Sequence, residues 1–196
     1  MRNNFKPPLA PSCGRPETTM AKKMLLWMDL EMTGLDEKAD KILEIAAIIT
    51  DYDLNEVAQK HYIVHQPEDV LENMNDWCKK HHGESGLTEL VKSGWKLDIV
   101  EKELCVWLKS YFGEKQGKEG AVLAGNSIHA DRRFLDAYLP EFSKLLHYRM
   151  VDVSSFKEVF RERWNLKYEK KNAHRAIGDL HESIGELKYY LSHVKP

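Results

Sequence analysis

The chain has 196 residues, 42% of them hydrophobic, and its 29 Lys and Arg against 31 Asp and Glu give a formal charge of −2. This length suits one domain with a real core, and the balanced charge argues against a protein that grips long nucleic acid by neutralising many phosphates. The three cysteines (Cys13, Cys78 and Cys105) form no CxxC pair, which argues against a disulfide framework or a zinc site and favours a reducing compartment. We therefore expect an intracellular, cytoplasmic protein, with the mitochondrion as the alternative, and no apolar run is long enough to predict a membrane span.

Residues 1–20 are predicted to be a tail ahead of one domain at residues 21–196. The tail contains four prolines and little apolar periodicity. Arg2, Lys6 and Arg15 precede the first acidic residue, a weak feature of a mitochondrial transit peptide. Because the prolines oppose an amphipathic helix, we expect a disordered tail, with a transit peptide as the alternative.

The rest of the chain predicts an α/β domain with a mixed sheet flanked by helices. Apolar runs predict strands at 25–30, 42–50, 61–65, 121–124 and 151–153. Apolar spacing and end signals predict helices at 97–111, 131–139, 155–164 and 177–191. The first three strands have short polar links, which favour an antiparallel meander, and the later alternation of strands and helices indicates the α/β class.

Two carboxylates interrupt the first predicted strand. Asp29 and Glu31 lie two residues apart in the apolar run 26–32, so both side chains point to one face of a strand. Burying these charges without a partner would be very costly. The alternative to a buried cation site is an edge strand whose charged face is solvated. Paired carboxylates on a core strand favour a site for a hard divalent cation such as Mg²⁺.

Two more acidic residues and a histidine each have an ordinary explanation when taken alone. Asp131 follows a polar turn, where it is explained as a helix cap, and Asp179 lies beside the apolar stripe of the last helix. His174 lies five residues before Asp179, which on a helix separates the two side chains by roughly 140°. They converge if His174 precedes a helix that begins near Arg175, and a histidine there suits a general base. A lone surface histidine is the alternative.

The order of these residues is more specific than any one of them. The chain reads D-x-E on a strand, N-x-x-x-x-D at a strand-to-helix turn and H-x-x-x-x-D late in the sequence. This pattern resembles the DEDD exonuclease superfamily in its histidine-bearing (DEDDh) branch, which has a ribonuclease H-like fold. The segments that narrow the resemblance to the oligoribonuclease family are 29–35, 125–127, 131–134, 147–149, 152–154 and 182–190.

The resemblance implies a 3′–5′ exoribonuclease with two divalent ions, Mg²⁺ or Mn²⁺. Their ligands would be Asp29, Glu31, Asp131 and Asp179, and His174 would take a proton from the attacking water. In such sites the two ions stabilise the attacking and the leaving oxygen. The products would be nucleoside 5′-monophosphates, and substrates of two to about five nucleotides need a pocket rather than a long basic surface.

The resemblance also implies which residues hold the RNA. Leu35 would wedge beside a base, and Trp77 would stack on one, although a core aromatic is the alternative for Trp77. His82 would be the partner of Trp77, with the adjacent His81 as the alternative. The cap on a 5′ phosphate would be Ser127, Tyr148, Arg149 and Ser154. In the family the tyrosine and the arginine reach across from a second subunit, so a homodimer is implied.

Two other functions are compatible with the sequence. A 3′–5′ exonuclease on longer RNA or DNA would use an open groove with more Lys and Arg, and the Tyr148-Arg149 motif argues against it. A non-catalytic nucleic-acid-binding module would be favoured by the loss of any of the four acidic residues, but all four are present.

Overall fold

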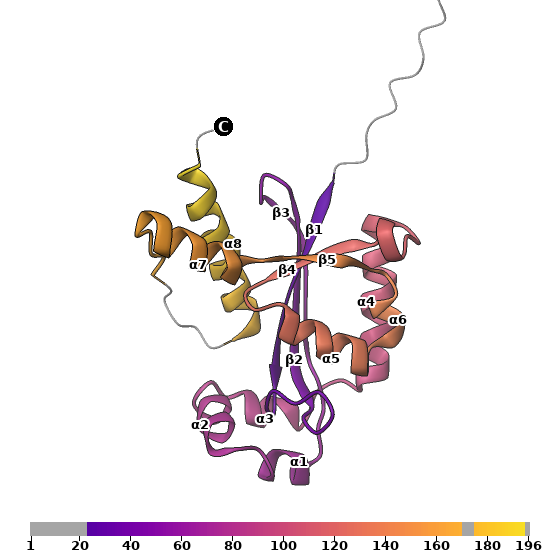
Figure 1. Ribbon diagram of the computed structural model, residues 1–196. Helices are drawn as coiled ribbons and strands as arrows, with labels where there is room; N and C mark the ends of the chain where they lie inside the picture. Colours follow the sequence, from indigo (N-terminus) through magenta and orange to yellow (C-terminus); the bar gives the residue numbers. More distant parts are fainter. Residues whose placement is uncertain (1–22, 170–174, 195–196) are drawn as a thin grey trace, which may run out of the picture.

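A five-stranded mixed sheet with helices on both faces forms the centre of the molecule (Figure 1). The computed structural model describes residues 23–169 and 175–194. The strands are β1 (Met24–Met32), β2 (Ile42–Asp51), β3 (Glu56–Ile63), β4 (Ala121–Gly125) and β5 (Leu146–Asp152), in the spatial order β3-β2-β1-β4-β5. β1, β2 and β3 pair antiparallel, whereas β4 pairs parallel with both β1 and β5. The predicted α/β class, mixed sheet and three-stranded meander are confirmed.

β1 lies in the middle of the sheet because it is apolar on both faces. Leu26 and Met28 pack into the core on one face, and Leu25 and Trp27 pack into the core on the other. A strand that is buried on both faces reads as a continuous apolar run. The alternative of a solvated edge strand for the paired carboxylates is therefore wrong.

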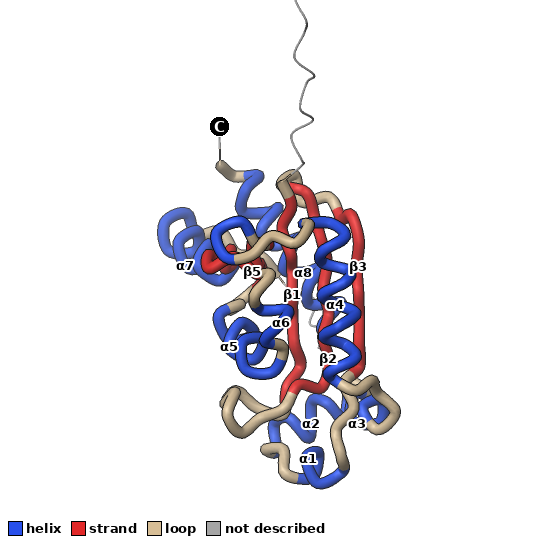
Figure 2. The backbone as a smooth tube through the Cα atoms, turned by 90° about the vertical axis from the view of Figure 1, so that its right-hand side faces the viewer, coloured by secondary structure: helices blue, strands red, loops and turns tan. Residues whose placement is uncertain are grey.

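Helices cover the two faces of the sheet as separate layers (Figures 1 and 2). One face carries α4 (Leu97–Phe112), α5 (His129–Tyr138) and α6 (Pro140–Ser143), and the other carries α7 (Val153–Trp164) and α8 (Ala176–Ser192). The short helices α1 (Glu68–Glu72), α2 (Asp76–Glu84) and α3 (Leu87–Val91) lie together beyond one end of β1 and β2 and form a small separate core with Leu43 of β2. A single 3₁₀ turn, η1 (Gly117–Glu119), precedes β4.

The predicted boundaries are wrong at both edges of the sheet. The predicted strand 61–65 is β3 at Glu56–Ile63, and the predicted strand 151–153 is β5 at Leu146–Asp152. Both are edge strands with many exposed positions, so their exposed polar residues hide the apolar signal. Helix α5 also begins two residues before the predicted Asp131, at His129. The predicted tail at 1–20 lies outside the described residues.

Candidate active site

Three carboxylates meet on the face of the sheet that α8 covers. Asp29 and Glu31 lie on the same face of β1 as Trp27, which packs in one core cluster with Leu180 of α8. Asp179 lies in the first turn of α8. One oxygen from each of Asp29, Glu31 and Asp179 lies within 4.8 Å of the other two. This set of hard oxygen ligands could hold a divalent cation.

Asp131 approaches β1 from another direction. β4 pairs with β1 only as far as Trp27, so the later part of β1 has no strand on that side. The Asp131 carboxylate takes this place, because its Oδ1 accepts a hydrogen bond of 3.0 Å from the backbone N–H of Leu30. The N-cap of α5 is Ile128, so the explanation of Asp131 as a helix cap is wrong. The structure thus brings the fourth acidic residue to the same stretch of β1 that carries Asp29 and Glu31.

Burial and crowding raise the pKa values of two of these carboxyls. Burial, followed by the charges of Glu44 and Asp179, raises the pKa of Glu31 to about 7. Burial also raises the pKa of Asp131 to about 7, and the charge of Glu31 adds to the shift. Carboxylates that share a site favour the neutral form unless a cation is present, and such shifts are typical of functional sites.

A buried ion pair that the sequence analysis missed lies beside this cluster. Glu44 on β2 is the register partner of Glu31, and its side chain is fully buried. Arg175 donates to Glu44 Oε1 from Nε at 3.1 Å and from Nη2 at 2.9 Å, and His61 Nε2 lies 2.5 Å from the same oxygen. Burial alone would raise the pKa of Glu44, but the hydrogen bonds from His61 and Arg175 hold it below its usual range. A single charged residue in the apolar run 42–49 is the signal that could have revealed it.

This ion pair fixes the start of α8 against the sheet. Arg175 is the N-cap residue of α8, and its carbonyl accepts the backbone N–H of Asp179. Asp179 is therefore one helical turn from the residue that anchors the helix to Glu44. His174, the predicted general base, lies outside the described residues and directly precedes Arg175.

A cavity of about 520 Å³ opens beside the acidic cluster, and Glu31 belongs to both. Leu35 and Trp77 line the cavity and are 71% and 61% exposed. The alternative of a core aromatic for Trp77 is therefore wrong. His82 also lines the cavity; it is buried, with Nε2 2.9 Å from the Met32 carbonyl oxygen. His81 instead stacks on the Trp77 ring, with ring centroids 3.9 Å apart.

Two of the four predicted cap residues are in contact. The backbone N–H of Ser127 donates to Ser154 Oγ at 2.8 Å and to Asp152 Oδ1 at 3.0 Å, and the two serine hydroxyl oxygens are 3.1 Å apart. Tyr148 and Arg149 lie within the edge strand β5, not before a strand as predicted, and both are exposed. Within the described residues, no hydrogen bond or ion pair joins either of them to the serines.

Known proteins identify the family of this chain. An exonuclease family model (RNase T) matches residues 26–187. The chain is 46% identical over 183 residues to the mitochondrial oligoribonucleases of Bos taurus and Homo sapiens, which covers 90% of this chain and 75% of each relative. It is also 46% identical over 170 residues to an oligoribonuclease of Francisella tularensis, covering 85% of this chain and 93% of that one. The chain belongs to the oligoribonuclease family of exonucleases.

Solved structures of exonuclease I have the same fold as this oligoribonuclease-family chain. One of them superposes with a TM-score of 0.66 at 13% identity, covering 87% of this chain and 41% of exonuclease I. At this identity the likeness shows the fold alone, and the predicted ribonuclease H-like architecture is confirmed. Family membership makes the protein a hydrolytic enzyme, which argues against the non-catalytic binding module.

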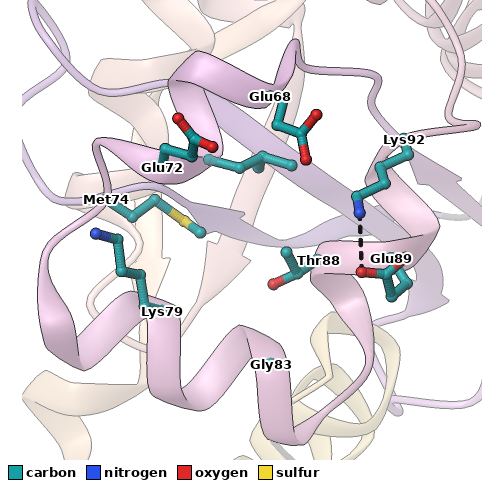
Figure 3. A pocket seen from close by; sticks show the side chains of 9 residues that line it. Glu68, Glu72, Met74, Lys79, Gly83, Thr88, Glu89 and Lys92 are labelled. Atoms are coloured by element: carbon teal, nitrogen blue, oxygen red, sulfur yellow. Dashed lines mark hydrogen bonds and ion pairs between the residues drawn. The ribbon is translucent and has the colours of Figure 1, made fainter.

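A second cavity of the oligoribonuclease-family chain lies apart from the acidic cluster. It has a volume of about 550 Å³ and lies between α1, α2 and α3 (Figure 3). Its lining mixes acidic, basic and apolar side chains, among them Glu68, Glu72, Lys79 and Met74, and none of the four acidic site residues lines it. Across the described part of the chain, we also find no helix that is long and apolar enough to cross a membrane.

Proposed function

We propose that the protein is a 3′–5′ exoribonuclease that hydrolyses RNA fragments of a few nucleotides, dinucleotides included, to nucleoside 5′-monophosphates. The observation that carries this proposal is the shared position of Glu31, which belongs to the acidic cluster and also lines the cavity beside it. A base held in that cavity would have its phosphodiester next to the carboxylates. The relatives named oligoribonuclease support RNA oligonucleotides as the substrate class.

Four carboxylates would hold two divalent ions, Mg²⁺ or Mn²⁺. They are Asp29, Glu31, Asp131 and Asp179. The donor set fits such ions, since it consists of carboxylate oxygens, and the raised pKa values of Glu31 and Asp131 reflect burial and crowding that a cation would offset. When bound, the ions would stabilise the charge that develops on the attacking and leaving oxygens.

His174 would be the general base for the attacking water. Its position next to Arg175 supports this role, because the ion pair between Arg175 and Glu44 brings the start of α8 to the carboxylate cluster. A histidine has a pKa close to neutral pH, so it accepts a proton from water without being permanently protonated.

The cavity would hold a base by stacking and wedging. Trp77 offers an exposed ring and Leu35 an exposed side chain in the lining of this cavity, and stacking on an aromatic ring does not depend on which base is bound. His82 lines the same cavity, and its Nδ1 is 3.9 Å from Glu31 Oε2. Burial lowers the pKa of His82, which favours the neutral ring.

The cap would select short RNA by closing the pocket around a 5′ phosphate. Ser127 and Ser154 would come from the same molecule. Tyr148 and Arg149 would come from a second copy in a homodimer, a reading supported by their exposure on β5, the strand at the edge of the sheet. An arginine and hydroxyl groups are suitable partners for a terminal phosphate.

The deciding experiment measures kcat/KM for 5′-phosphorylated RNAs of two, three, five and ten nucleotides with Mg²⁺, Mn²⁺ or EDTA. We expect the dinucleotide to be the best substrate, each added nucleotide to lower kcat/KM, and EDTA to abolish turnover. Asp29→Asn should remove activity without unfolding, while Asp98→Asn, on an exposed face of α4, is the matched control. A flat or rising profile with length would contradict the short-RNA assignment, and activity in folded Asp29→Asn would contradict the metal site.

A further inference from the structure

We propose that Asn126 is a positioning residue that couples the phosphate-cap serines to the helix that carries Asp179. This inference rests on the proposed function, because it assumes that the serines bind a 5′ phosphate and that Asp179 binds metal. Asn126 follows β4 at the turn into α5, between the two groups, and is half-buried.

Every polar group of the Asn126 side chain has a partner on one side or the other. Its Nδ2 donates to Ser183 Oγ at 2.8 Å and to Glu186 Oε2 at 3.0 Å, both on α8. Its Oδ1 accepts from Ser154 Oγ at 3.1 Å, at the start of α7. Ser183 and Glu186 are 3% and 1% exposed, so these bonds are shielded from water and their loss is costly.

The hydrogen bonds run in one direction from the cap to the metal helix. Ser154 donates its hydroxyl proton to Asn126, so its oxygen accepts from the N–H and hydroxyl of Ser127. Ser183 donates its hydroxyl proton to the Asp179 carbonyl, which leaves its oxygen to accept from Asn126. Asn126 therefore joins Ser154 through Oδ1 and Ser183 through Nδ2, so a movement of either serine acts on the other through one planar amide group.

The backbone around Asn126 is held in place by contacts on both sides. Ser127 has a positive φ of 49°, a conformation that L-residues rarely adopt. Its N–H donates to both Asp152 and Ser154. On the other side, a Cβ at Gly125 would lie 2.9 Å from the Met28 carbonyl oxygen. The turn is therefore rigid, and Asn126 transmits a displacement of α8 to the serines rather than absorbing it.

The test compares Asn126→Ala, Ser154→Ala and Ser183→Ala, with Asn55→Ala as the matched control. Asn55 also makes a side-chain hydrogen bond, to Asp51 in the turn between β2 and β3, and within the described residues none of its hydrogen bonds involves the acidic cluster or the serines. Two quantities are measured for each variant: the ratio of kcat/KM for a 5′-phosphorylated against a 5′-hydroxyl dinucleotide, and the Kd for Mn²⁺ in the RNA-free protein. Melting temperatures show that each variant is folded.

We expect Asn126→Ala to lower the phosphate ratio and to raise the Mn²⁺ Kd, each by about threefold to tenfold, the range of one or two hydrogen bonds. Ser183→Ala should lower the phosphate ratio although Ser183 is on α8, and Ser154→Ala should raise the Mn²⁺ Kd. Adding Ser183→Ala to Asn126→Ala should have little further effect, because both remove the same link.

The coupling is overturned if Ser183→Ala changes only the Mn²⁺ Kd and Ser154→Ala changes only the phosphate ratio, or if the effects of Asn126→Ala and Ser183→Ala add. These single-hydroxyl variants decide the matter if Asn126→Ala does not fold. If the wild-type protein cleaves the 5′-phosphorylated and 5′-hydroxyl dinucleotides equally well, the proposed cap is contradicted, and the coupling is contradicted together with it. If the wild-type protein prefers the 5′-phosphorylated dinucleotide but the variants keep its phosphate ratio and its Mn²⁺ Kd, the coupling alone is contradicted.

Discussion

Replacing Arg175 with Met should destabilise the protein by leaving a buried carboxylate without its main partner. Glu44 is fully buried, whereas the Arg175 side chain is 29% exposed. Removing one partner of a buried ion pair costs about 3–5 kcal/mol. Because Arg175 is partly solvated and His61 still contacts Glu44, we expect a loss near the lower end, about 3 kcal/mol. For a chain of this size, that corresponds to a fall in Tm of roughly 6–12 °C.

The assay is thermal unfolding of Arg175→Met beside Glu44→Gln, the double variant and a surface control. Lys102→Met removes an exposed partner of Asp98, and exposed pairs contribute little, so its Tm should not change measurably. The double variant should be more stable than Arg175→Met alone, since it removes the uncompensated charge. The reasoning is refuted if Arg175→Met melts within about 2 °C of the wild type, or if the double variant is no more stable than that single variant.

Three further predictions concern the base, the cavity and the carboxylates. His174→Ala should lower kcat by roughly 10²–10⁴-fold with Mn²⁺ binding intact; near-normal turnover with chemistry rate-limiting would exclude it as the base. Trp77→Ala should weaken binding of a dinucleotide by about 1–3 kcal/mol, and Trp164→Ala, an equally large exposed change on α7, should not. In EDTA, Tm should fall as the pH rises from about 4 to about 7 and level off above that, because the pKa values of Glu31 and Asp131 are raised in the folded protein, so the unfolded chain ionises first. Asp131→Asn should flatten this profile, and an unchanged slope would show that Asp131 is ionised at neutral pH in the folded protein.

The sequence predicts the centre of this fold better than its edges. β1 and β2 are buried on both faces, so their apolar runs mark them directly. β3 and β5 lie at the sheet edges, where polar side chains are tolerated because many positions are exposed to solvent. The apolar pattern therefore does not show where these strands begin. Because the predicted strand begins at residue 151, Tyr148 and Arg149 are expected before it, whereas they lie within β5.

The candidate site is also predicted in part: its acidic residues could be predicted from the sequence, but the long-range contacts that hold them could not. Asp29 and Glu31 could be predicted because charges within an apolar strand need a reason, and the order of the motifs added Asp131 and Asp179. Local spacing does not show which residues of distant segments pair. The bond between Arg175 and Glu44 joins positions 131 apart, and the bond between Asn126 and Ser183 joins positions 57 apart.

These long-range bonds explain how an acidic site can be held together before any cation binds. Carboxylates within 4.8 Å of one another repel, so α8 needs attachments that hold Asp179 near β1 against that repulsion. Arg175 supplies one at the start of the helix through Glu44, and Asn126 supplies another further along it through Ser183 and Glu186. Both attachments end on buried polar groups, Glu44 in one case and Ser183 and Glu186 in the other, where a lost hydrogen bond is not readily replaced by water. The geometry of the site therefore depends on residues that bind neither metal nor RNA, and substitutions at Glu44 or Asn126 should change metal affinity without removing a ligand.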